Sequence, residues 1–400
     1  MNSENRQSMT REEYERREAR RLKRRQERIR RQKRERLVRL LIMVVIPVAV
    51  IIVASVLVIN AIVGAVGNKK PGEKTSEVVA VESEPDDKPE KKKDKYKGPY
   101  LIAIAPVEFE ILEPEPEFPE GSHGATSDIP LFAHSAESTD ATKGFNDEMT
   151  SGYGILIDTT TGEIVASRSG KDRMVPASMT KVLTVLTAYR HITDDQLDEM
   201  IEISAQAGDY AYRNDCSIVG FSTGEKVAVR DLFYGTILPS GGDAAYALAE
   251  YVAGDMDTFV DMMNETVKEL GLEQTSHFTN PVGIYDDNLY TTPYDMAMIM
   301  WAAEDYAFLH DVLETHIYTT TKTEEHPDGI TVSNWFLRRI EDKDCGLYVA
   351  GGKTGFVVQS GNCAVSYAEA EDGHNYICCT GSAHSSWRAI YDHVAAYNQR

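Results

Sequence analysis

The sequence has little of what builds disulfide frameworks and metal sites. Its 400 residues include five cysteines with no Cys-x-x-Cys pair, and its ten histidines lack the spacing of metal ligands. The odd cysteine count and the missing pair argue against a zinc site. We therefore expect no metal and no other cofactor.

Basic residues are scarce after position 39. Residues 1–39 hold sixteen Lys and Arg against seven Glu; subtracting these from the totals of 42 and 63 leaves 26 basic and 56 acidic residues in the remainder. Clustered Lys and Arg also occur in nucleic-acid-binding segments. Here Glu residues are interleaved at i,i+4 spacing and an apolar run follows at once. We interpret residues 1–39 as a basic cytoplasmic segment beside a membrane, and we expect no nucleic-acid partner.

Long hydrophobic runs are absent except for one. Residues 40–67 have no ionisable side chain. At about 1.5 Å per helical residue this run crosses a hydrocarbon core of about 30 Å, and it is too long for a signal-peptide core. The Arg/Lys flank before it favours a cytoplasmic N-terminus. We expect one transmembrane helix at residues 40–67, with the rest of the chain outside the cell membrane.

Aromatic residues are few in the next segment. Residues 68–150 are rich in Pro, Glu, Lys, Ser and Asp, as in EPDDKPEKKKDKYKG. Such a composition buries too little apolar surface to offset the entropy of ordering. We predict an acidic, Pro-rich extracytoplasmic stalk that is largely disordered.

Residues 151–400 have the pattern of one folded α/β domain. Short apolar runs at 154–158 and 163–167 flank a Thr-Thr-Thr-Gly turn and predict a hairpin. The other expected elements are helices at about 178–191, 231–238, 244–252 and 385–397 and strands at about 347–358, 362–370 and 375–380. The predicted order is a hairpin, then helices, then a three-stranded meander and a closing helix.

Ser178 and Lys181 lie three residues apart at the start of an expected helix. Residues at i and i+3 share a helix face, so the serine hydroxyl and the lysine amine can meet. A lysine whose pKa is lowered by burial can deprotonate a serine nucleophile. A Ser-x-x-Lys pair alone is more often a solvated helix turn than a catalytic pair.

Two further motifs favour a catalytic interpretation. Ser240-Gly241-Gly242 forms a predicted turn after an apolar helix, and Lys353-Thr354-Gly355 lies in a predicted strand beside two more glycines. Glycine inside a strand indicates close approach of another group to the backbone. Separately, the serine is explained as a helix cap and the lysine as an exposed strand residue. In combination and in this order, the three motifs favour an active site.

A resemblance to a known family rests on four segments: DTTTGEIVASRSGKDRMVPASMTKVLT, VRDLFYGTILPSGGDAAYALAEYVAG, HFTNPVGIYDDNLYTTPYDMAMI and GGKTGFVVQSGNCAVS. The chain resembles, over about residues 154–397, the serine-type D-alanyl-D-alanine carboxypeptidases of peptidase family S11, which are low-molecular-mass penicillin-binding proteins. The resemblance implies a β-lactamase/transpeptidase-like α/β fold, with an antiparallel sheet flanked by helices and a helical subdomain. It also implies peptidoglycan stem peptides ending in D-Ala-D-Ala as substrates and β-lactams as covalent inhibitors.

The resemblance also implies roles for single residues. Ser178 matches the acylated nucleophile, Lys181 its base, and Ser240 the serine that relays a proton toward the leaving D-alanine. Lys353 and Thr354 match the residues that polarise that relay and bind the terminal carboxylate, and Gly355 completes their motif. The backbone N–H groups of Ser178 and Phe356 would form the oxyanion hole.

The chain departs from the family pattern at Gly242, where an Asn is usual. Losing the hydrogen bonds of that carboxamide costs about 1 to 3 kcal/mol, or roughly ten- to a hundredfold in rate. One alternative is therefore a weakly catalytic penicillin-binding or wall-binding module. The other is a β-lactamase, although the sequence has no convincing Glu in an omega-loop motif.

Overall fold

A computed structural model describes residues 131–400. The predicted basic segment, the predicted membrane helix and most of the predicted stalk lie outside the described residues. Within residues 131–400, no helix combines the length and the apolar character needed to span a bilayer.

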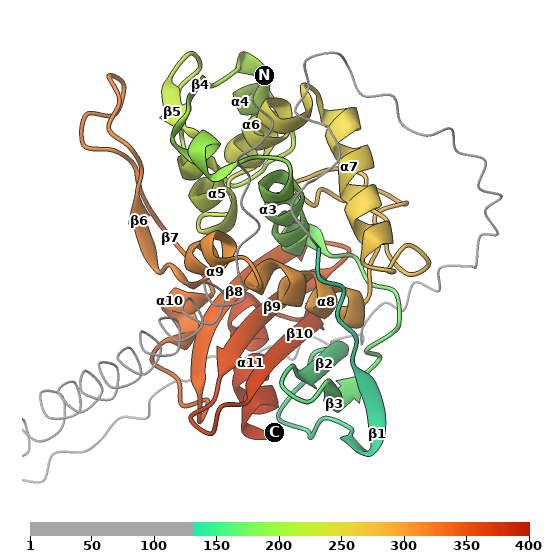
Figure 1. The fold of residues 1–400 in the computed structure, drawn as a ribbon. Coiled ribbons are helices and arrows are strands. Elements are labelled where there is room, and N and C mark those ends of the chain that lie inside the picture. Colours follow the sequence, from blue (N-terminus) through green and yellow to red (C-terminus); the bar gives the residue numbers. More distant parts are fainter. Residues whose placement is uncertain (1–130) are drawn as a thin grey trace, which may run out of the picture. The chain divides into compact units, whose positions relative to one another are not determined.

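The described residues form one mixed sheet with helices on both faces (Figure 1). Its strands lie in the order β1-β3-β2-β10-β9-β8, and every pair is antiparallel except β1 with β3. The strands are β1 (Glu137–Lys143), β2 (Tyr153–Asp158), β3 (Glu163–Arg168), β8 (Tyr348–Val357), β9 (Gly361–Glu369) and β10 (Asn375–Ala383). The predicted hairpin and the predicted three-stranded meander are confirmed, and β2 pairs with β10 to join them.

The stalk prediction was wrong at its C-terminal end, because β1 lies inside the segment assigned to the stalk. Strand β1, with the sequence ESTDATK, is almost wholly exposed and pairs with β3 through its backbone. A polar edge strand has no alternating apolar pattern, so composition alone assigns it to a disordered segment. The folded domain therefore begins before residue 151.

Helices cover both faces of the sheet. Helices α10 and α11 pack with one apolar cluster, and α8 and α9 pack with the other. The bounds are α8 (Pro293–Glu304), α9 (Ala307–Glu314), α10 (Leu337–Ile340) and α11 (Ser386–Asn398). Cys378 and Cys379 point to opposite faces of β10 and are both fully buried, because each face is covered.

A second group of helices forms the upper half of Figure 1. Its elements are α3 (Thr180–Arg190), α4 (Ala205–Arg213), α5 (Val229–Ile237), α6 (Gly242–Ala253) and α7 (Met256–Glu269), with the short hairpins β4 (Met200–Glu202) with β5 (Lys226–Ala228) and β6 (Ile317–Thr319) with β7 (Thr331–Ser333). Helix α3 is buried along nearly its whole length and contacts α5, α6, α7 and α8. Helix α3 therefore holds the Ser-x-x-Lys motif in a fixed position.

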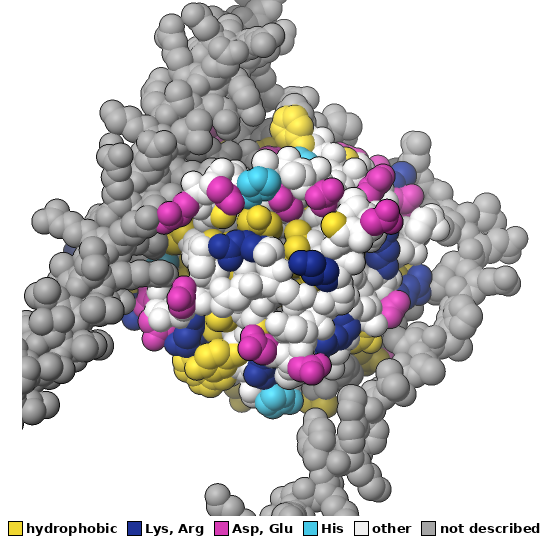
Figure 2. All heavy atoms as spheres, turned by 90° about the horizontal axis from the view of Figure 1, so that it is seen from below, with side chains coloured by type: hydrophobic (Ala, Val, Ile, Leu, Met, Phe, Trp, Pro, Cys, Tyr) yellow, Lys and Arg dark blue, Asp and Glu magenta, His cyan; other side chains and the backbone are white. Residues whose placement is uncertain are grey.

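The surface seen from below the sheet is polar. Figure 2 shows acidic and basic side chains interspersed on this face, with hydrophobic side chains in separate groups. Charged side chains separate the hydrophobic groups on the coloured part of this face. The distinctive chemistry of the domain lies instead between the sheet and the helical part.

Candidate active site

Ser178 lies in a short 3-10 turn, Ala177–Met179, directly before α3. The sequence prediction placed it in the first turn of the α-helix itself. Ala177 has a φ of 47°, in the left-handed region that non-glycine residues rarely adopt. Ser178, the next residue, lines a cleft, and backbone outliers of this kind are common at functional sites.

Lys181 is 1% exposed, and its Nζ lies 3.2 Å from Ser178 Oγ. Its Nζ also donates a 2.8 Å hydrogen bond to the carbonyl oxygen of Val282. Burial lowers the pKa of Lys181 from 10.5 to about 8, although nearby Cys216 and Asp243 oppose the shift. A neutral amine is therefore accessible near physiological pH, next to a hydroxyl that it can deprotonate.

The loop that supplies the Val282 carbonyl was not identified as functional from the sequence. Asn280 Oδ1 accepts hydrogen bonds from the backbone N–H groups of Val282, Gly283 and Ile284, which fixes the loop. Gly283 has a φ of 82°, and a Cβ there would lie 1.8 Å from the carbonyl oxygen of Ala177. The Asn-Pro-Val-Gly sequence is thus the signal for a loop that packs on the Ser178 turn.

Strand β8 brings the third motif to the same place. A Cβ at Gly355 would lie 3.0 Å from the backbone nitrogen of Ser178, so only glycine allows this approach. Lys353 is 2% exposed and its Nζ donates to the carbonyl oxygen of Thr354. Burial, followed by the positive charge of Lys181, lowers the pKa of Lys353 well below its usual range.

Ser240 lies in the turn between α5 and α6, and its φ of 64° again lies in the left-handed region. The cleft has a volume of about 380 Å³, and Ser178, Lys181, Ser240, Thr354 and Phe356 all line it. The structure therefore brings the first two predicted motifs and most of the third to one cavity. Lys353 does not line this cavity, but its charge interacts with that of Lys181, which does.

Cys216 occupies the space beside Gly242. A Cβ built on Gly242 would lie 2.7 Å from Cys216 Cβ and 3.1 Å from its Sγ. The Gly242 N–H donates to the carbonyl oxygen of Ser217, and Asp243 accepts from the N–H groups of Val219 and Gly220, so the Cys216 loop is docked on the second motif.

Cys216 is one of the residues that line the cleft, and burial raises the pKa of its thiol, so that the thiol stays neutral. The sequence predicts no role for this cysteine beyond its place in an odd set of five. No local pattern marks it, because its proximity to Gly242 arises from tertiary packing.

A scan against family models matches the D-alanyl-D-alanine carboxypeptidase family, Peptidase_S11, over residues 138–380. Among curated proteins, the chain is 32% identical over 145 residues to the D-alanyl-D-alanine carboxypeptidase DacF of Bacillus subtilis, which is 36% of each chain. It is 31% identical over 216 residues to DacD of Salmonella typhimurium, which is 52% of each chain. The chain thus spans about a third to a half of the length of these relatives.

Solved structures of DD-transpeptidase and penicillin-binding proteins also match this chain, over a larger share of its residues. The crystal structure of the Streptomyces K15 DD-transpeptidase matches with a TM-score of 0.57 and 29% identity, covering 63% of this chain and 97% of that one. Penicillin-binding protein 5 of Haemophilus influenzae matches with a TM-score of 0.54 and 28% identity, covering 61% of this chain and 68% of that one. Because the family model covers more than half of the residues, the chain belongs to the D-alanyl-D-alanine carboxypeptidase family of serine-type peptidases.

Proposed function

We propose that the protein is a serine-type D-Ala-D-Ala carboxypeptidase that removes the terminal D-alanine from peptidoglycan stem peptides. The observation that carries the proposal is the 3.2 Å contact between Ser178 Oγ and the buried Lys181 Nζ, inside a cleft shared with Ser240 and the Thr354-Gly355 segment of β8. Family membership supports the same reaction. We infer that β-lactams acylate Ser178 as substrate mimics.

Acylation begins with proton transfer from Ser178 to neutral Lys181. The Ser178 oxygen then attacks the penultimate D-Ala carbonyl, forming a C–O bond, and negative charge develops on the carbonyl oxygen. The backbone N–H groups of Ser178 and Phe356 are the donors we assign to that oxyanion; β8 approaches the Ser178 nitrogen closely at Gly355. The C–N bond breaks, and the proton passes from Lys181 through Ser240 to the leaving D-alanine.

Deacylation repeats the sequence with water as the nucleophile. Lys181 takes a proton from the water, the ester bond to Ser178 breaks, and the proton returns to the serine oxygen. We assign Lys353 to the relay, because its charge interacts with that of Lys181, and Thr354 to hydrogen bonding of the substrate's carboxylate or peptide group.

Substituting Ser178 tests this function. Full-length protein should release D-alanine from a diacyl-L-Lys-D-Ala-D-Ala peptide, and Ser178→Ala should release none. Fluorescent penicillin should label the first protein and not the second. Unchanged turnover in Ser178→Ala would refute the assignment. Labelling without D-alanine release would favour a penicillin-binding module, and rapid nitrocefin turnover would favour a β-lactamase.

We further propose that residues 40–67 anchor the protein in the cell membrane, with the catalytic domain outside. The uncharged run and its basic N-terminal flank support this topology. Protease added to intact cells should remove the epitope of a tag after Arg400 and spare a tag before Met1. Protection of both tags would overturn the orientation.

A further inference from the structure

A row of aromatic and basic side chains lies where α10 meets α11. Trp335, Arg339 and Lys343 follow one another at four-residue spacing on and directly beside α10. Trp387 and Tyr391 have the same spacing on α11. Residues four apart share one helix face, so each of the two segments presents a single stripe. We call these five residues the aromatic–cationic row.

The two stripes alternate cation and ring. The Cζ of Arg339 lies 5.1 Å from the ring centroid of Trp335 and 5.4 Å from that of Trp387. The Nζ of Lys343 lies 5.7 Å from the Trp387 centroid and 6.0 Å from the Tyr391 centroid. Each neighbouring pair is within the range of a cation–π contact, and these contacts hold the five side chains in a fixed order.

The rings of the row are held in place but are not buried. Trp335, Trp387 and Tyr391 are 57%, 49% and 46% exposed. Tyr397, which is also on α11, is fully buried and belongs to the apolar cluster that α10 and α11 share. Single exposed hydrophobic residues are ordinary, whereas a contiguous set of them marks a surface that binds another molecule. The row is therefore a candidate binding surface.

The ring surface of the row is more available than its charge. Lys343 forms an ion pair with Asp342, and Arg338, beside the row, forms one of 3.3 Å with Glu341. None of the ion pairs among residues 131–400 includes Arg339. A polyanion is attracted by several unpaired cations of one sign. With one such cation among three rings, the row favours a ligand that has apolar faces and neutral hydrogen-bond acceptors.

The row continues outward from the catalytic cleft. Trp335 and Arg339 line the cleft that contains Ser178, whereas Trp387 and Tyr391 do not line it. A ligand that is bound at Ser178 and extends past Trp335 therefore meets the rest of the row. Under the proposed function, the stem peptide in the cleft is one branch of a polymer whose other component is a chain of sugar rings.

A sugar ring matches this surface chemically. One face of a pyranose carries mainly C–H bonds and stacks on the face of an indole or a phenol, and its hydroxyl and acetamido oxygens accept hydrogen bonds from a guanidinium. We propose that the aromatic–cationic row binds the glycan chain of peptidoglycan while a stem peptide of the same polymer occupies the cleft. The inference rests on the proposed function for the identity of the polymer.

The test titrates full-length protein with glycan chains from which an amidase has removed the stem peptides. Two of the three tryptophans belong to the row, so intrinsic fluorescence reports binding there. Trp387→Ala and Tyr391→Ala should each weaken binding about tenfold, and Tyr391→Phe, which keeps the ring, should bind like the wild type. Phe132→Ala removes a similarly exposed ring outside the row and is the matched control, which should also bind like the wild type.

Turnover separates the row from the cleft. Release of D-alanine from diacyl-L-Lys-D-Ala-D-Ala should be unchanged in Trp387→Ala and Tyr391→Ala, because neither residue lines the cleft. For intact peptidoglycan, kcat/KM should fall about tenfold in both variants, mainly through KM. If the wild-type protein binds glycan and releases no D-alanine, the proposed function fails and the assignment of the row is supported by the binding alone.

Four outcomes would overturn the inference. Wild-type protein that does not bind the stripped glycan lacks the site. Tighter binding of poly-L-glutamate than of glycan, with a steep loss in salt, would assign the row to a polyanion. A dimer that Tyr391→Ala dissociates would assign the row to a second copy of the chain. Lower stability of Trp387→Ala in urea with unchanged glycan affinity would assign the row to the joint between α10 and α11.

Discussion

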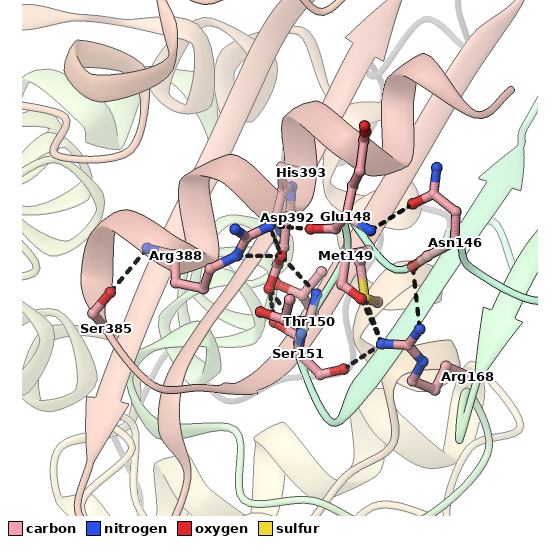
Figure 3. Close-up of polar contacts among 11 residues, drawn as sticks. Asn146, Glu148, Met149, Thr150, Ser151, Arg168, Ser385, Arg388, Asp392 and His393 are labelled. Atoms are coloured by element: carbon pink, nitrogen blue, oxygen red, sulfur yellow. Dashed lines mark hydrogen bonds and ion pairs between the residues drawn. The ribbon is translucent and has the colours of Figure 1, made fainter. Parts of the chain in front are cut away.

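Buried charge is handled in opposite ways on the two faces of the sheet. On α11, the carboxylate of Asp392 is fully buried and accepts from the backbone N–H groups of Thr150 and Ser151, from Ser151 Oγ and from Arg388 (Figure 3). In the cleft, Lys181 and Lys353 are equally buried, yet none of the ion pairs among residues 131–400 includes either of them.

The difference separates a structural region from a functional one. Asp392 and Arg388 tie the segment before β2 to the closing helix, and Arg168 binds the carbonyl oxygens of Met149 and Ser151 in the same segment. A buried charge with complete hydrogen bonding stabilises this arrangement. Burying a lysine without an ion-pair partner lowers the stability of the fold and lowers the pKa of that lysine. Acid–base catalysis makes use of such a lowered pKa.

The largest expected effect comes from removing the charge in the cleft. Lys181→Met should lower kcat/KM for D-alanine release by about a thousandfold, because the general base is lost. The free energy of unfolding in urea should stay the same or rise, because an unpaired buried charge is replaced by an apolar side chain.

Lys226→Met, at an exposed position on β5, is the matched control and should change neither quantity. A loss of stability in Lys181→Met would mean that Lys181 supports the fold, as Asp392 does. The comparison between the two regions would then fail.

Asp392→Ala should lose stability and keep its activity, which is the opposite of what we expect for Lys181→Met. Removing this carboxylate takes away the ion-pair partner of Arg388 and the acceptor of two backbone N–H groups, and we expect a loss of about 3 to 5 kcal/mol in the free energy of unfolding. Where the variant is folded, kcat/KM should match the wild type. Asp392→Asn keeps the shape and some of the acceptors, so it should lose less. Reduced kcat/KM in fully folded Asp392→Ala would contradict the distinction.

The sequence predicts much of this arrangement and misses identifiable parts. The hairpin and the meander follow from alternating apolar residues and turn residues, and the motifs of Ser178, Ser240 and Lys353 follow from residue type and spacing. Strand β1 is missed because it is polar and exposed. Cys216 is missed because it belongs to no local pattern and reaches the cleft through the tertiary packing of a separate loop.

The pH dependence tests whether Lys181 is the titrating base. Because its neutral form is the base and its pKa is about 8, kcat/KM should rise with pH up to about 8 and then level off. The free energy of unfolding should also rise with pH. The unfolded chain binds more protons than the folded one between pH about 8 and 10.5, so the contribution of Lys181 to stability rises over that window.

Rates of labelling by fluorescent penicillin and urea unfolding measure the two quantities across this range. Lys226→Met should retain both trends, and Lys181→Met should show a weaker stability trend, because Lys353 contributes in the same direction. Labelling by the wild-type protein that is independent of pH below 8 would assign the proton transfer to another group.

The smallest expected effect concerns Gly242 and Cys216. Restoring the usual motif residue with Gly242→Asn alone places a Cβ 2.7 Å from Cys216 Cβ, so we expect overpacking to cost about 1 to 3 kcal/mol of stability. The double variant Gly242→Asn with Cys216→Gly opens the space and should recover that loss. Urea unfolding of both variants and of Cys216→Gly gives the coupling between the positions. If Gly242→Asn is as stable as the wild type, the thiol does not fill this space, and the glycine leaves a real gap in the second motif.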